Sequence, residues 1–170
     1  MHSRETRVSF VPASTIPQPR QDARDPIATL LHDISLRLQD AVPHDTALLM
    51  AHDDRRRLLS VVARTPFGGS HIKTGDRFPV DGSAIDVLAG EVAMAVCLDT
   101  RVSDGTFERK LSKENVSAAV TALIETAEGS QYLLALGSCG TEACDVGRAT
   151  QAVRQTRLCV SAATPTGREP

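Results

Sequence analysis

The sequence contains two pairs of short apolar runs, and only a few polar residues separate the two runs of each pair. Residues 46–51 and 58–63 form the first pair, across a charged turn. Residues 116–124 and 132–136 form the second pair, across a turn at 127–130. Connections this short join antiparallel neighbours, because parallel strands need a crossover of about a dozen residues or more. The two predicted hairpins therefore indicate an antiparallel sheet.

Two amphipathic segments flank the hairpins. The first begins at Asp25, a favourable N-cap, followed by Pro26 in the first turn, and its helical spacing of apolar residues stops before Pro43. The second covers residues 144–162. Both helices must bury an apolar stripe against the sheet, so the chain is predicted to be an α+β domain with these two helices on one sheet face.

Residues 65–115, between the hairpins, are rich in loops. They hold a short segment at 77–80, a short helix at 84–89, a strand at 92–98 and a helical turn around 107–111 within an irregular stretch. The sheet is therefore expected to have five to six strands, with the loops and the short helix on its other face. A sheet face covered by loops is a natural place for a ligand cavity.

Length and charge narrow the class of protein. The 170 residues suit one domain, predicted at 25–162, with a flexible tail at 1–24 and a disordered tail at 163–170. The 19 Lys and Arg balance 21 Asp and Glu, which argues against a nucleic-acid binder. The basic run Arg55–Arg57 follows two aspartates and reads as a solvated turn. Neither a membrane span nor a signal peptide is recognisable, so a cytoplasmic protein is expected.

The order of these elements resembles a GAF domain, a module that binds small molecules in many signalling proteins. The likeness rests on residues 58–63 at the second strand, on 75–84 leading into the short helix, and on 87–91 followed by a strand that ends at Asp99. It covers residues 25–162, and so implies a GAF-like fold for nearly all of the chain.

The resemblance also implies a function. We expect a regulatory sensor, and no enzyme, that binds a small molecule or responds to a redox cue, signals to a protein partner and pairs as a homodimer through its terminal helices. A protein-interaction module with a collapsed pocket is the alternative. Free methionine-R-sulfoxide reductases also resemble GAF domains, but the stretches that carry their cysteines correspond here to 67–71, 81–84 and 99–104, which contain none. That reaction would lack its nucleophile.

The candidate ligand-binding residues lie in the loops that cover the sheet. The chain has four Phe, one Tyr and no Trp, so the three phenylalanines of this region either line a cavity or fill the core. A serine, an aspartate and a histidine are the polar groups near them. The predicted ligand-binding residues are Phe67, His71, Phe78, Ser83, Asp99 and Phe107.

The cysteines suggest a weaker, redox hypothesis. Cys139 and Cys144 lie just before the last helix, where the helix dipole favours the thiolate of Cys144, and the two could form a reversible disulfide. Cys97 and Cys159 lie in a strand and a helix, where cysteine usually acts as a small apolar residue. The isolated histidines give no metal site, and the sequence leaves any cofactor unknown.

Overall fold

The structure, a computed structural model, describes residues 25–65, 70–140 and 145–162. The tails predicted at 1–24 and 163–170 lie outside these residues. Within the described residues, six strands and four helices follow one another. The strands are β1 (Thr46–Asp53), β2 (Leu58–Arg64), β3 (Arg77–Pro79), β4 (Met94–Cys97), β5 (Ala118–Glu125) and β6 (Gln131–Ser138). The helices are α1 (Pro26–Leu38), α2 (Ala84–Leu88), α3 (Thr106–Lys113) and α4 (Val146–Ala162).

The strands form one sheet in the order β3-β2-β1-β6-β5-β4, and every neighbouring pair is antiparallel. The predicted hairpins are β1–β2 and β5–β6, and β1 pairs with β6 at the centre of the sheet. The α+β class and the antiparallel sheet are therefore confirmed. The strands β3 and β4 form the two edges of the sheet.

Two elements differ from expectation. The strand predicted at 92–98 is shorter, Met94–Cys97, and the Leu98 side chain after it is 74% exposed. The helical turn expected around 107–111 is a helix of two turns, Thr106–Lys113. Its buried face holds Phe107, Glu108 and Leu111, while its remaining side chains are basic or small.

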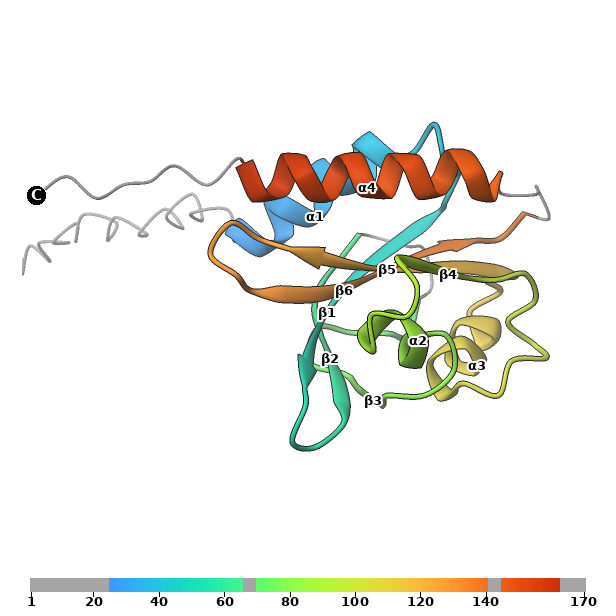
Figure 1. The fold of residues 1–170 in the computed structure, drawn as a ribbon. Helices are drawn as coiled ribbons and strands as arrows, with labels where there is room; N and C mark the ends of the chain where they lie inside the picture. The colour runs from blue at the N-terminus through green and yellow to red at the C-terminus, as the bar shows by residue number, and fades with distance from the viewer. Residues whose placement is uncertain (1–24, 66–69, 141–144, 163–170) are drawn as a thin grey trace, which may run out of the picture.

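One face of the sheet is covered by α1 and α4, which pack against each other (Figure 1). The Asp25 side chain caps α1 by accepting the N–H of Ile27 at 3.0 Å. From α1, Leu31 and Ile34 are buried against the sheet, where Leu49 and other strand residues meet them. The predicted helix layer is confirmed.

The opposite face is covered by α2, α3 and the loops that join them to β3 and β4 (Figure 1). Successive strand residues point to opposite faces, so Leu48 and Met50 of β1 belong to this side while Leu49 belongs to the helix side. Residues of the cover, including Ile72 and Val87, complete this second core. None of the helices described is both long enough and apolar enough to cross a bilayer.

Candidate ligand-binding site

Phe78 and Phe107, two of the predicted ligand-binding residues, pack against each other on the loop-covered face. Phe78 lies on β3 and Phe107 in the first turn of α3, with ring centroids 5.3 Å apart in an edge-to-face arrangement. The two side chains are only 6% and 2% exposed. The rings therefore join α3 to the edge of the sheet and fill this part of the core.

Ser83, a third predicted residue, belongs to a buried polar cluster beside these rings. Its backbone N–H donates to Oε1 of Glu108 at 2.9 Å, and its hydroxyl donates to the same oxygen. The hydroxyl of Thr121 on β5 in turn donates to the Ser83 hydroxyl at 2.7 Å. Glu108 is 1% exposed, so its carboxyl group is held by protein groups inside the fold.

The second carboxyl oxygen of Glu108, Oε2, is buried and has no hydrogen-bond partner among the described residues. It lies against two glycines from different segments. A Cβ atom added at Gly82 would come within 2.5 Å of Oε2, and one added at Gly105 would come closer still. Only glycine fits at these two positions while Glu108 keeps its place. We call Gly82, Ser83, Gly105 and Glu108 the glutamate clamp.

A second carboxylate, Asp81, makes the complementary connection. Its Oδ1 accepts the backbone N–H of Thr106 at 2.9 Å, and its Oδ2 accepts the Thr106 hydroxyl at 2.6 Å. Asp81 therefore caps the start of α3, while Glu108 of α3 accepts the N–H of Ser83, the N-cap residue of α2. Each short helix is capped by a carboxylate from the segment of the other.

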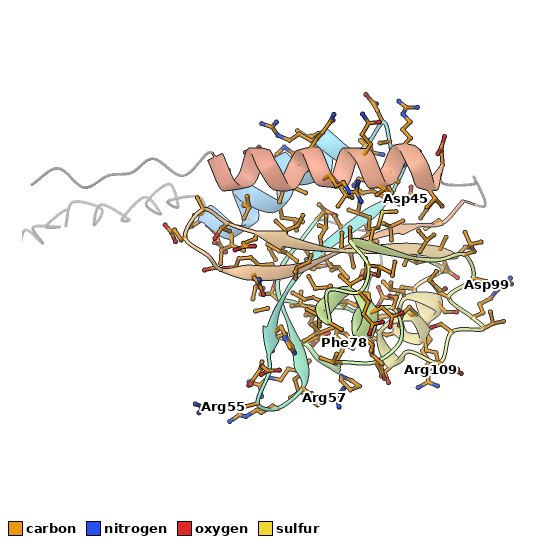
Figure 2. The ribbon with its side chains drawn as sticks, viewed as in Figure 1. Asp45, Arg55, Arg57, Phe78, Asp99 and Arg109 are labelled. Atoms are coloured by element: carbon orange, nitrogen blue, oxygen red, sulfur yellow. The ribbon has the colours of Figure 1, made fainter. Side chains whose placement is uncertain are left out.

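An open groove of about 540 Å³ lies between β3 and α3. Figure 2 labels two of its lining residues, Phe78 and Arg109, on the same side of the molecule. This volume is within the range of small-molecule sites. The groove is lined by Asp76, Arg77, Phe78, Thr106, Arg109, Lys110 and Lys113.

The groove carries an excess of positive charge, because four of its lining residues are basic and one is acidic. The ion pairs Arg56–Asp53 and Arg101–Asp99 do not involve the groove. Arg109 makes a long contact of 3.4 Å with the Thr106 hydroxyl. The acidic member, Asp76, accepts the N–H of Lys73 at 2.9 Å.

Of the predicted ligand-binding residues that the structure describes, only Phe78 lines this groove, and Ser83, Phe107, His71 and Asp99 do not. The His71 side chain is exposed, and its backbone N–H donates to Glu114 Oε1 at 2.6 Å. Asp99 pairs with Arg101 at 2.8 Å at the edge of the molecule, away from Phe78 (Figure 2). The hydrogen bonds from Arg101 lower the pKa of Asp99 to about 2. Phe67 lies outside the described residues.

The two described cysteine side chains are free thiols. Cys139 is exposed, and its backbone N–H donates to Asp45 Oδ2 at 2.7 Å. Partial burial and the negative charge of Asp45 raise the pKa of the Cys139 thiol, and burial raises the pKa of the half-buried Cys97. Both thiols are therefore less ionised at neutral pH than a free cysteine. Cys144 lies outside the described residues, so the Cys139–Cys144 disulfide stays a prediction.

Sequence reasoning missed Glu108 and the basic residues of α3, because it left most of residues 100–113 irregular. A signal was present. Phe107 and Leu111 are four residues apart, which places them on one face of a helix, and Glu108 shares that face. An acidic residue on the apolar face of a helix indicates a buried polar contact.

Comparison with known proteins finds similarity in structure only. No model of a protein family matches the sequence, and no curated protein matches it either. The GAF domain of a two-component sensor histidine kinase from Bacillus halodurans is similar, with a TM-score of 0.59 and 11% identity, over 79% of this chain and 92% of that domain.

Two phytochrome structures are also similar. The chromophore-binding domain of an unusual bacteriophytochrome from R. palustris gives a TM-score of 0.56 and 8% identity, over 80% of this chain and 56% of that one. The chromophore-binding domain of a phytochrome from Stigmatella aurantiaca gives a TM-score of 0.55 and 13% identity, over 84% of this chain and 55% of that one. This chain thus spans a little over half the length of both phytochrome domains.

At sequence identities this low, similarity in structure establishes only the fold, and function has to be argued from the site itself. The shared architecture is the antiparallel six-stranded sheet with helices on one face and a cover of loops and short helices on the other. By its fold, the chain is a GAF-like domain.

Proposed function

We propose that the chain is a regulatory sensor domain that binds a small molecule in the β3–α3 groove and signals to a protein partner. The observation that carries the proposal is the groove of about 540 Å³, whose two walls come from separate segments that one ligand can bridge. The similar structures include a domain of a sensor kinase and two chromophore-binding domains, which supports a sensory role. No catalytic step is part of the proposal.

The signal would pass through α3. This helix is fixed to β3 by the Phe78–Phe107 contact and to the α2 segment by the caps of Asp81 and Glu108. A ligand that binds one position of α3 more tightly than another shifts the population toward that position. Movement of α3 therefore has a direct route to α2 and to the sheet.

The terminal helices are the proposed route to a partner. Leu36 on α1 is 62% exposed and Val146 on α4 is 53% exposed, so both helices keep apolar side chains on the surface. We propose a homodimer through these helices. Light scattering after size exclusion tests it: the wild type should be a dimer at micromolar concentration and Leu36→Glu a monomer. A monomeric wild type would contradict it.

A second candidate function is a protein-interaction module without a ligand. The close contact of Phe78 and Phe107, both nearly fully buried, favours it because the rings occupy the space predicted for a cavity. The two functions differ in one measurable respect, since only a ligand-binding domain is stabilised by a small molecule.

The test is a thermal-shift screen of charged and neutral metabolites, followed by calorimetry of each compound that raises the melting temperature. Arg109→Trp places a large side chain in the groove and should abolish binding. The matched control is Arg55→Trp, an exposed position on the β1–β2 turn far from Arg109 (Figure 2). The sensor proposal fails if no compound raises the melting temperature, or if Arg109→Trp and Arg55→Trp bind equally well.

A further inference from the structure

We infer that the β3–α3 groove takes a small ligand that carries phosphate groups. The inference rests on the proposed function, because it names the class of ligand for the same site. Its basis is the set of four basic side chains around one concavity, from β3 on one wall and from α3 on the other. They are Arg77, Arg109, Lys110 and Lys113.

These side chains differ from other basic residues of the surface in that all four line one concavity. Arg56 and Arg101 each have an aspartate within salt-bridge distance. In the part of the chain that the structure describes, the four groove residues have none, and the groove's own Asp76 bonds to the backbone of Lys73. Four positive charges that share one groove with a single carboxylate leave a net repulsion, which a bound anion relieves.

The helix dipole explains part of this arrangement. Lys110 and Lys113 lie in the last turn of α3, where cations are favourable. Arg109 lies nearer the middle of α3, and Arg77 lies on another element, so the dipole accounts for neither. Two arginines and two lysines that line one concavity match a ligand with several anionic oxygens.

Phosphate suits the groove better than a single carboxylate. A carboxylate has one charge and two oxygens, and it would leave most of the four cations without a partner. A phosphate ester or diphosphate carries about two charges or more and at least three acceptor oxygens. The net charge of −2 for the whole chain opposes a long polyanion such as RNA, which contacts an extended basic surface.

Inorganic pyrophosphate is the probe. It is titrated into the full chain at low and at physiological ionic strength, with affinity measured by calorimetry and the site mapped by backbone amide NMR shifts. We expect the shifts to gather on β3 and α3. The double variant Arg109→Gln/Lys113→Gln should weaken binding about tenfold or more, since charge-assisted bonds to phosphate are lost.

The matched control is Arg37→Gln/Arg55→Gln, which removes the same charge at two exposed positions outside the groove. It should bind pyrophosphate nearly as well as the wild type. Equal weakening in both double variants, or shifts that map elsewhere, would overturn the inference. A short RNA that binds more tightly than pyrophosphate, through the same residues, would overturn it as well.

A neutral compound from the thermal-shift screen separates this inference from the proposed function. If such a compound binds and Arg109→Gln/Lys113→Gln leaves its affinity unchanged while pyrophosphate does not bind, the sensor remains and the phosphate assignment is wrong. If neither pyrophosphate nor any compound of the screen binds, both fail.

Discussion

Replacing Gly105 by alanine tests whether the glutamate clamp holds the cover on the sheet. The backbone of Gly105 has φ −70° and ψ 134°, which alanine adopts without strain. In such a conformation, glycine to alanine normally stabilises a protein by about 0.4–1 kcal/mol, because alanine restricts the unfolded chain. A loss of stability would therefore have to come from the neighbours of the new methyl group.

The neighbours leave no room for it. The new Cβ would lie 2.8 Å from Cδ of Glu108 and 2.9 Å from Cα of Gly82, and its shortest approach would be to Glu108 Oε2. Glu108 must then leave Ser83, whose N–H and hydroxyl lose their acceptor, and each donor left without a partner costs about 1–3 kcal/mol. Partial relaxation and the gain from alanine reduce this sum, so we expect a net loss of about 2–4 kcal/mol.

Urea unfolding of Gly105→Ala, Glu108→Ala and the double variant gives the answer as a double-mutant cycle. Once Glu108 is shortened, its share of the clash at Gly105 disappears and only the approach of 2.9 Å to Cα of Gly82 remains, so the losses of the two single variants should not add. Additive losses, or a Gly105→Ala protein as stable as the wild type, would show that the clamp does not hold the cover.

Three further predictions concern single positions. Gly82 (φ 56°) and Gly90 (φ 77°) both adopt the left-handed region, but only Gly82 has close neighbours. In urea unfolding, Gly90→Ala should therefore lower the free energy of unfolding by about 1 kcal/mol, and Gly82→Ala should lower it clearly more. Burial lowers the pKa of His44 below 6.5, so the unfolded chain binds the proton more readily than the folded one. The free energy of unfolding should therefore be constant above pH 6.5 and fall as the pH drops below it. A pH series of urea midpoints measures this fall, which His44→Gln should remove. At pH 7 the Cys139 thiol should react with iodoacetamide more slowly than free cysteine, and Asp45→Asn should speed it; an unchanged rate would contradict the effect of the Asp45 charge.

Much of the fold could be predicted from the sequence because its signals are local. The hairpins are set by apolar runs and short turns, and the start of α1 by the Asp25 side chain, which bonds two residues along the chain. The helix at Thr106–Lys113 was underestimated because its cap is not local. Asp81, which caps it, lies 25 residues earlier, and no spacing rule connects the two.

The candidate site was predictable only in part, for the same reason. The covering segment was identified, and it brings Phe78, Ser83 and Phe107 to one region. Asp99 turns outward to pair with Arg101. Sequence spacing alone does not show whether Asp99 pairs with this neighbour or faces the ligand site. The positive charge of the groove arises where β3 meets α3. These elements lie apart in the sequence, at Arg77–Pro79 and Thr106–Lys113, so no local pattern brings their basic residues together.

The exchange of caps between Asp81 and Glu108 has a consequence for how this region opens. Neither α2 nor the start of α3 can fray alone, since each loses its cap when the other departs. Segments that depend on one another in this way exchange their amide protons as one cooperative unit with a common opening free energy. Whatever loosens one of the two short helices should therefore release both, so that the cover responds as a whole.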